Sequence, residues 1–274
     1  MPVDYHIHLE RGPFSLDYLR EFVRVATGRG LREIGFSEHP YHFRECRGIY
    51  PTENPWIDAQ WARRLEEYVR LVEQAKELGF PVKLGMEWDY IPGHEEEVAR
   101  ILEAYPWDYA IGSVHWLRNE RRWWAIDDPN EREEWDRQDP AQVYHQYFRH
   151  IEAAAASGLF DVIGHVDVVK IFGYRPSEEM TALYEEVARV LWRAGVCVEV
   201  SSAGWYKPVR EVYPGPQILR ILARLGVPVV PSSDAHEPDH VGRDFDRILA
   251  LIREAGYTQI WTFTARSRSP LPLP

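Results

Sequence analysis

The sequence predicts an α/β fold made of repeated strand-and-helix units, and three observations support this prediction. Six times along the chain, a glycine ends an amphipathic stretch and a short apolar run follows within a few residues. The amphipathic stretches have the period of helices, with apolar residues recurring on one face. The length of 274 residues suits one large α/β domain or two small ones.

The expected strands follow one another at short intervals. Glycine is the usual residue just after a helix, because it adopts a left-handed conformation without a Cβ penalty. The glycines and the runs after them are Gly30 with 33–37, Gly79 with 82–87, Gly158 with 160–165, Gly195 with 196–200, Gly226 with 229–230 and Gly256 with 259–263. Two further runs, 3–8 and 109–115, are equally short and apolar but lack the glycine. The chain therefore contains seven or eight βα units.

The helices expected between these strands are amphipathic. In 61–78, the apolar residues that share one face are Leu65, Tyr68, Val69, Val72 and Ala75. The stretch 16–26 has a similar face that includes Leu19 and Phe22. A single apolar stripe lets each helix pack against a sheet while its charged face meets solvent.

Seven or eight βα units form either a closed parallel barrel or an open doubly wound sheet. The sequence has no G-x-G-x-x-G or Walker A motif, which makes a nucleotide-binding open sheet the weaker alternative. Two long loops, 40–58 and 116–140, follow the expected second and fourth strands. They would lie on the face where barrel enzymes carry their active sites, as lids, as substrate walls or as solvated insertions.

Composition excludes several classes of protein. The net charge of −11 argues against binding nucleic acid through a broad basic surface. No apolar run approaches the roughly 18 residues of a membrane helix, and the charged N-terminal residues do not resemble a signal peptide. The two cysteines, Cys46 and Cys197, lie far apart, which excludes a disulfide framework. We therefore expect a cytoplasmic protein that binds neither nucleic acid nor membranes.

Histidines gather at the ends of the expected strands. Six of the eleven histidines, one glutamate and one aspartate fall there: His6, His8, His39, Glu87, His115, His165, Asp234 and His236. Alternate residues of a strand share a face, so the two histidines of His6-Ile7-His8 point the same way. Because the carboxyl ends of parallel strands meet at one mouth of a barrel, we expect all eight side chains to converge.

Such a cluster predicts a metal site. Six imidazoles in one place would repel each other if protonated and would be costly if buried without partners. Neutral imidazole and carboxylate are ordinary ligands of divalent ions such as Zn, Fe and Mn. Eight ligands exceed the number that one ion with an open position requires. We therefore expect two or three ions, with Glu87 as a bridging carboxylate.

The motifs resemble those of the polymerase and histidinol phosphatase (PHP) superfamily, and the match runs from His6 to His236. They are Asp-x-His-x-His, Ser-Glu-His, Gly-x-Glu, Ser-Val-His, Gly-His-x-Asp and Ser-Asp-Ala-His. Within the superfamily, the stretches 199–207 and 212–216 resemble the monofunctional histidinol-phosphate phosphatases. The resemblance implies a single domain over 1–274, built as a distorted seven-stranded βα barrel similar to a TIM barrel, with three metal ions.

The resemblance also implies which residues hold each ion. His6, His8, Glu87 and Asp234 would hold the first ion, and Glu87, His115 and His165 the second. His39 and His236 would hold the third. Family members often carry another histidine near position 14, where this chain has Phe14. The third ion would therefore bind more weakly, or would recruit Glu10 or His42.

The implied activity is hydrolysis of a phosphate monoester, L-histidinol phosphate, in histidine biosynthesis. Clustered divalent ions lower the pKa of water and neutralise phosphoryl oxygens. The expected catalytic residues are Glu87, Asp234 and His236. Lys207 or Arg118 would help to bind phosphate and Trp116 could stack on a flat ring, while the leaving-group proton would come from Asp234 or from water. Acidic residues of the loop 116–140 could attract the cationic leaving group: Asp127, Asp128, Glu131, Glu133 and Glu134.

Three alternative functions are open to a chain with these motifs. One is another phosphoesterase of the same superfamily, acting on nucleotides or small phosphates. Another is an amidohydrolase-type metal enzyme, which also begins with His-x-His in a barrel but does not account for His39 or His236. The third is a metal-stabilised accessory domain of a polymerase, although no polymerase domain is attached.

Overall fold

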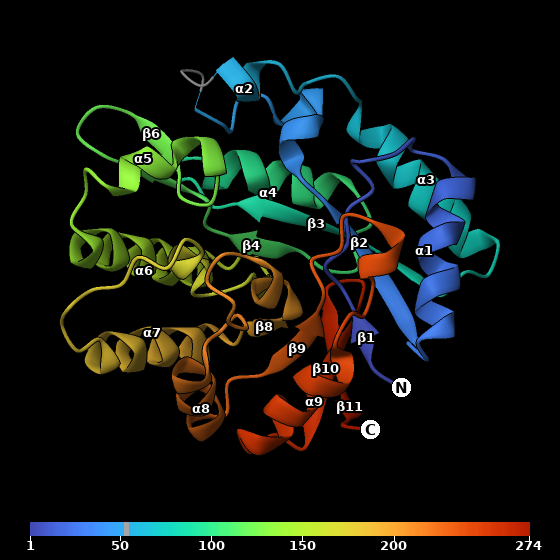
Figure 1. The fold of residues 1–274 in the computed structure, drawn as a ribbon. Coiled ribbons are helices and arrows are strands. Elements are labelled where there is room, and N and C mark those ends of the chain that lie inside the picture. The colour runs from blue at the N-terminus through green and yellow to red at the C-terminus, as the bar shows by residue number, and fades with distance from the viewer. Residues whose placement is uncertain (52–54) are drawn as a thin grey trace.

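The computed structural model describes residues 1–51 and 55–274. In this part of the chain, seven parallel strands form one sheet in the order β1-β2-β3-β4-β7-β8-β9. They are β1 (Val3–Asp4), β2 (Glu33–Glu38), β3 (Val82–Asp89), β4 (Ile111–Ser113), β7 (Val162–Ile163), β8 (Cys197–Ser201) and β9 (Val229–Ser232). Beyond the two edge strands, Ile7 pairs with Ala235, and the His8 amide donates to the Ala235 carbonyl at 2.8 Å. The sheet therefore curls into a nearly closed barrel (Figure 1).

Helices surround this barrel on the outside, as Figure 1 shows. Those longer than four residues are α1 (Leu16–Gly28), α3 (Leu65–Glu77), α4 (Glu95–Ala104), α6 (Pro140–Ala156), α7 (Thr181–Ala194), α8 (Pro216–Leu225) and α9 (Phe245–Glu254). Strands and helices alternate along most of the chain, so each helix returns the chain to the start of the next strand. All neighbouring barrel strands in the described residues therefore pair in parallel. The predicted α/β barrel is confirmed.

The helix ends follow the predicted glycine pattern. Gly195 and Gly226 stop α7 and α8 with φ angles of 71° and 73°, and their amides donate to the last helical carbonyls. The helix predicted over 61–78 starts later than expected, at Leu65. Arg64 before it has an extended backbone, and Arg63 pairs with Phe43 in an isolated bridge, so these residues cannot join the helix. The apolar face predicted for this helix is buried.

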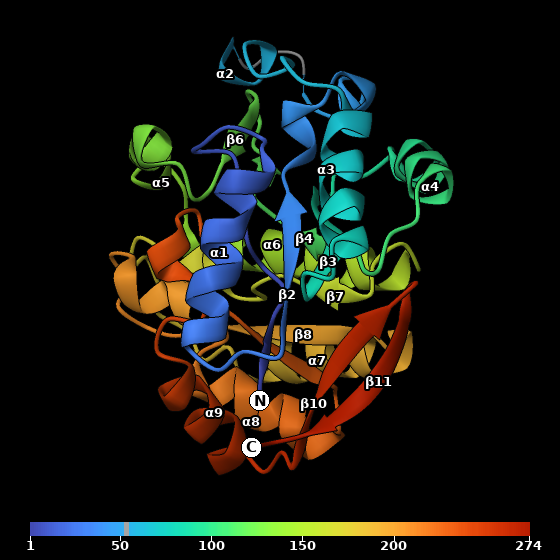
Figure 2. The same ribbon diagram turned by 90° about the vertical axis from the view of Figure 1, so that its right-hand side faces the viewer.

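The strand predicted over 259–263 forms, but outside the barrel. It is β10 (Gln259–Thr264), which pairs antiparallel with β11 (Ser267–Pro272). The Ala265 amide at the turn donates to Asp108, and the Phe263 amide donates to the Tyr5 hydroxyl, so this hairpin crosses the amino ends of the barrel strands (Figure 2). The reason is that β1 and β9 close the barrel on each other and leave β10 no edge to join.

The barrel interior beneath the carboxyl ends is filled by aromatic packing. The Tyr109 ring lies there fully buried, and its hydroxyl donates to the carbonyls of Tyr5 at 2.6 Å and Phe36 at 3.1 Å. A Cβ atom at Gly35 or Gly85 would overlap this ring. The two glycines therefore let Tyr109 close the floor below the mouth of the barrel.

Both predicted long loops lie beside that mouth. The loop 40–58 carries η1 (Pro40–His42), η2 (Arg44–Cys46) and α2 (Pro55–Asp58), while its residues 52–54 lie outside the described residues. The loop 116–140 contains the hairpin of β5 (Trp116–Arg118) and β6 (Trp123–Ala125), then η3 (Pro129–Glu131) and α5 (Arg132–Trp135). Other short 3-10 helices follow barrel strands: η4 (Val168–Lys170), η5 (Ser202–Tyr206) and η6 (Pro238–His240). None of the helices in the described ranges has the length and apolar content to span a membrane.

Candidate metal centre

The eight predicted ligand residues come together at the carboxyl end of the barrel. Glu87 is part of β3, and the others directly follow strands: His6 and His8 after β1, His39 after β2, His115 after β4, His165 after β7, and Asp234 and His236 after β9. Parallel strands deliver them to one mouth because all their carboxyl ends point the same way. His165 and Asp234 have left-handed backbones, with φ angles of 37° and 50°, a strained conformation that concentrates at functional sites.

The Glu87 carboxylate lies at the middle of the cluster, only 1% exposed. Its Oε2 lies 3.0 Å from His6 Nε2 and 3.5 Å from His8 Nε2. Its Oε1 lies 2.8 Å from His165 Nε2 and 3.6 Å from His115 Nε2. His39 Nδ1 also lies 3.2 Å from Oε2. Each oxygen therefore faces a different group of imidazoles, which is the arrangement of a carboxylate between two cations.

Asp234 completes the first group. Its Oδ1 lies 3.5 Å from His8 Nε2 and 3.8 Å from His6 Nε2. Around a tetrahedral ion with ligand bonds of about 2.1 Å, ligand atoms are about 3.4 Å apart. The four separations between these two histidines and the two carboxylates, 3.0 to 3.8 Å, are close to that value, so these side chains could hold one ion. Glu87, His115 and His165 form a second group of the same kind.

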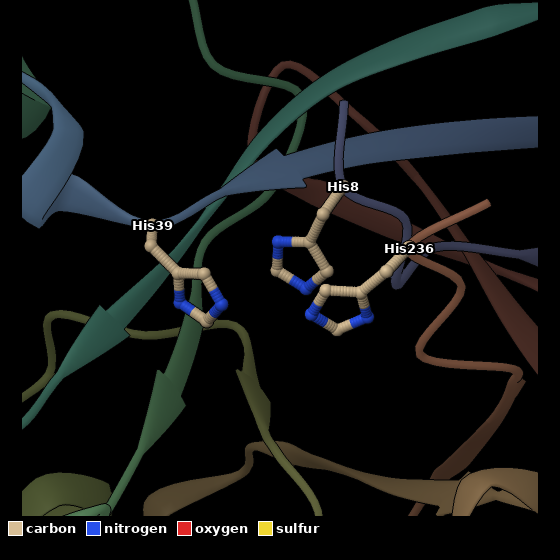
Figure 3. Close-up of side chains that lie close together, drawn as sticks. All are labelled: His8, His39 and His236. Atoms are coloured by element: carbon tan, nitrogen blue, oxygen red, sulfur yellow. The ribbon is translucent and has the colours of Figure 1, made fainter. Parts of the chain in front are cut away.

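A third group lies on the outer side of His8. The His8 ring stacks on both His39 and His236, with ring centroids 4.2 and 4.4 Å away (Figure 3). Ligand atoms of these three histidines lie within 4.8 Å of one another. Glu10 Oε1 lies 3.5 Å from His236 Nε2, and Glu10 Oε2 lies 2.8 Å from His42 Nε2. Of the two residues predicted to replace the missing histidine, Glu10 therefore lies next to His236, and His42 contacts the other oxygen of Glu10.

Orphaned nitrogens show that these residues fit divalent ions. His6 Nε2, both ring nitrogens of His8 and His39 Nδ1 are buried and make no hydrogen bond within the described part of the chain. A buried polar atom left without a partner costs about 1–3 kcal/mol. Cations bound to the lone pairs of these nitrogens would remove that cost.

The protonation states of the cluster differ from one ligand residue to the next. Burial opposes the charge on Glu87, but His6, His39 and His115 outweigh it and hold the pKa of Glu87 well below its usual range. Burial and the neighbouring His8 lower the pKa of His39 well below its usual value, and lower that of His236 to about 4. Burial also opposes the charge on His6, His8 and His115, but neighbouring carboxylates outweigh it and raise the pKa of each, that of His115 to about 10. At neutral pH Glu87 is therefore ionised and His39 and His236 are neutral, the forms that bind divalent ions, whereas His6, His8 and His115 would release protons when an ion binds.

Buried carboxylates behind the cluster orient its histidines. Glu199, on β8 and fully buried, lies 2.5 Å from His6 Nδ1. Asp89 lies 2.6 Å from His115 Nδ1 and also accepts the Tyr50 hydroxyl. Such partners fix the ring orientation and leave the other nitrogen free for a metal. The sequence analysis assigned no role to either residue, although Glu199 opens a stretch singled out by the resemblance to histidinol-phosphate phosphatases.

A pocket of about 290 Å³ opens beside the cluster. His39, His115 and His236 are among the residues that line it. Residues of the two long loops line it too, among them Trp116, which is predicted to contact substrate. The long loops therefore serve as pocket walls. The full set of lining residues adds Tyr41, Trp56, Asp89, Ala125, Asp127, Asp128, Pro129 and Asn130.

The two predicted phosphate-binding cations lie in different places. Burial would raise the pKa of Asp234, but His6, His236 and, more weakly, Lys207 hold it well below its usual range. Arg118 is exposed and lines a separate surface cavity with Glu134 and other residues. Arg118 therefore does not line the pocket beside the candidate metal centre, whereas the charge of Lys207 acts on Asp234.

Comparison with known proteins agrees with this geometry. The chain matches the PHP domain over residues 4–203. It belongs to the PHP family. Asp234 and His236 lie beyond the matched residues, so the family match covers the larger part of the cluster, from His6 to His165, but not its last two members.

Relatives within the PHP family match nearly the whole chain. A protein of Deinococcus radiodurans named probable histidinol-phosphatase is 35% identical, and the alignment covers 97% of this chain and 98% of the relative. The histidinol-phosphatase of Bacillus subtilis is 29% identical, with coverage of 90% and 97%. A crystal structure of the histidinol phosphate phosphatase of Lactococcus lactis, complexed with zinc, L-histidinol and phosphate, has a TM-score of 0.75 at 22% identity and covers 98% of each chain. This structural similarity shows that nearly the whole chain has the same barrel fold as that enzyme.

Proposed function

We propose that this protein is a metal-dependent phosphatase that converts L-histidinol phosphate and water into L-histidinol and phosphate. The observation that carries the proposal is the cluster around Glu87, in which two groups of imidazoles face the two oxygens of one buried carboxylate. Full-length relatives named histidinol-phosphatase support the choice of substrate. The reaction would take place in the cytoplasm, as a step of histidine biosynthesis.

The proposed cofactors are two or three divalent ions of zinc, iron or manganese. His6, His8, Glu87 and Asp234 would hold the first ion, and Glu87, His115 and His165 the second. For the third ion, the geometry favours His39, His236 and Glu10, because a Glu10 oxygen lies 3.5 Å from His236 Nε2. A zinc ion in the related Lactococcus lactis enzyme is consistent with this ligand chemistry.

The proposed chemistry assigns a role to each group at the mouth. Divalent ions, when bound, lower the pKa of water and neutralise phosphoryl charge. Glu87 would hold two of them at a fixed spacing, and His236 would help to hold the phosphate end of the substrate beside Lys207. Because Asp234 stays ionised, it would act as a ligand and a hydrogen-bond acceptor, and the leaving alkoxide would take its proton from water in the pocket.

A phosphate-release assay tests the proposal. Purified protein should release phosphate from L-histidinol phosphate, lose this activity with a chelator and regain it when Zn, Mn or Fe is added back, because the ligand cluster needs ions to function. Full activity of protein that is metal-free by mass spectrometry would contradict the metal-dependent mechanism.

A panel of other phosphate esters tests the choice of substrate. If kcat/KM is highest for L-histidinol phosphate, the proposed substrate is supported. A higher kcat/KM for a nucleotide or for another small phosphate would instead indicate a different phosphoesterase of the PHP family. The panel needs no variant of the protein, because it compares leaving groups at one and the same site.

A further inference from the structure

Three aspartates line the pocket beside the cluster, and two of them are already engaged. Asp89 holds His115 and the Tyr50 hydroxyl, so both of its oxygens have partners. Asp128 begins η3, where one of its oxygens accepts from the backbone and side-chain amides of Asn130. Both carboxylates therefore already accept hydrogen bonds from groups of the protein itself.

Three glutamates of the same loop have partners elsewhere in the protein. Glu131 forms a two-oxygen contact with Arg122, at 2.9 and 3.0 Å. Glu134 accepts from Asn119 and Gln138, and Glu133, 87% exposed, lies 3.5 Å from Arg137. None of these three glutamates is among the residues that line the pocket. These glutamates are therefore not placed to contact a ligand bound in this pocket.

Asp127 differs from all of these acids. It lines the pocket and is half-buried, yet its carboxylate makes no hydrogen bond or ion pair with any residue the structure describes. Burial raises the pKa of Asp127, while the nearby His115 imidazole and Lys207 ammonium oppose this rise. A half-buried carboxylate without a partner is costly, and a cation from a ligand would relieve that cost.

We propose that Asp127 binds the ammonium group of the substrate and so selects phosphate esters of amino alcohols. This inference rests on the proposed function. With the phosphoryl group at the ligand cluster, the leaving group would extend into the adjoining pocket, which Asp127 and His115 both line. An aliphatic ammonium is charged at neutral pH, whereas an imidazole with a pKa of about 6.5 is mostly neutral. The ammonium is therefore the group that calls for a carboxylate.

The same pocket accommodates the rest of the leaving group. Tyr41, Trp56 and Trp116 contribute aromatic surface to its walls. A flat imidazole ring packs well against such surfaces. Asp127 would therefore fix the orientation of the amino alcohol, while the aromatic walls would enclose its ring.

The test compares L-histidinol phosphate with 3-(imidazol-4-yl)propyl phosphate. This analogue has the same carbon chain, ring and phosphate but lacks the amino group. Wild-type protein should prefer the amino compound, since only that compound has the ammonium. In Asp127→Asn, kcat/KM for L-histidinol phosphate should fall roughly 10- to 100-fold, as expected for loss of one partner of a partly desolvated charge pair. The value for the analogue should change less than threefold, so the preference disappears.

A matched variant separates this contact from a general effect of charge. Glu133→Gln removes one negative charge from the same loop at an exposed position outside the pocket. It should keep the wild-type preference. If Asp127→Asn keeps the preference as well, or if Glu133→Gln loses it equally, the inference is wrong. If wild-type protein hydrolyses neither imidazole ester but does hydrolyse phenyl phosphate, the proposed function itself fails, which is a different result.

Discussion

Glu87 lies between two groups of histidines and directs one carboxylate oxygen toward each. Its position within β3 holds it rigidly, and the Ser113 hydroxyl donates to its Oε1 at 2.7 Å. A side chain on a strand is placed more accurately than one on a loop, which matters for ligands that must keep a fixed geometry. Two proposed metal positions therefore depend on a single residue.

Glu87→Gln should weaken metal binding at both positions that share this side chain. The amide keeps the shape of the side chain but removes the negative charge, so we expect less metal per chain by elemental analysis. Phosphate release should fall by at least roughly 100-fold, since even residues behind a ligand affect metal sites 10- to 100-fold. Glu97→Gln, on the partly exposed surface of α4, is the control. Normal metal content and rates in Glu87→Gln would exclude the bridging role.

Glu199 shows why some site residues escape a reading of the sequence. It lies inside the apolar strand β8, and 193 residues separate it from His6, whose Nδ1 it contacts. Nothing local to either residue indicates this pairing, because it depends on the positions of β1 and β8 in the barrel. Histidines at strand ends carry a local signal, whereas their supporting carboxylates do not.

At the scale of elements, the packing of β2 and β3 around Tyr109 determines how closely the strands approach below the site. Gly35 and Gly85 lie where the Tyr109 ring fills the barrel, and that ring bonds to two strand carbonyls. The sequence shows these glycines inside two predicted strands, where glycine often marks a close approach. The structure identifies what approaches them.

Gly35→Ala should therefore destabilise the protein. The added methyl would overlap the Tyr109 ring, and overpacking of this kind costs about 1–3 kcal/mol. Urea unfolding followed by circular dichroism would measure the loss. Gly28→Ala is a matched control, since a Cβ atom at this last residue of α1 meets no other atom and alanine favours the helix. Equal stability of the two variants would contradict this account of the barrel floor.

The chain beyond β9 shows how closure of the barrel determines where a later strand can pair. The run 259–263 has the same local pattern as the barrel strands, namely a glycine followed by apolar residues. Because Ile7 pairs with Ala235, no edge remains for an eighth barrel strand. The run instead folds back on β11 and covers the amino ends of the strands, opposite the metal centre.

At the scale of the whole molecule, the cluster joins distant parts of the chain. Its ligands come from β1, β2, β3, β4, β7 and β9 or from the residues that follow them. Without ions, buried ring nitrogens of His6, His8 and His39 at this junction make no hydrogen bond among the described residues. Binding of ions to the folded state alone would therefore stabilise the entire barrel.

Removal of metal should lower the melting temperature measurably. A ligand present at 100 times its Kd adds about 2.7 kcal/mol, so loss of at least one ion should lower the Tm by about 5 °C in a protein of this size. Differential scanning calorimetry with and without a chelator would measure this, and addition of Zn or Mn should restore the original Tm. An unchanged Tm after complete removal of metal would show that the cluster does not need ions to be stable.

The sequence by itself determined the α/β class, the strand ends and the eight residues that converge there, because helical period, terminal glycines and strand-end histidines are local patterns. The division into a single domain over 1–274 stays a prediction. Only the tertiary structure decided that β10 lies outside the barrel, that Glu10 meets His236 and that Arg118 lies away from the cluster. It also decided that Asp127 is the unpaired acid of its pocket among the described residues. These features depend on contacts between segments far apart in the chain, which no local pattern records.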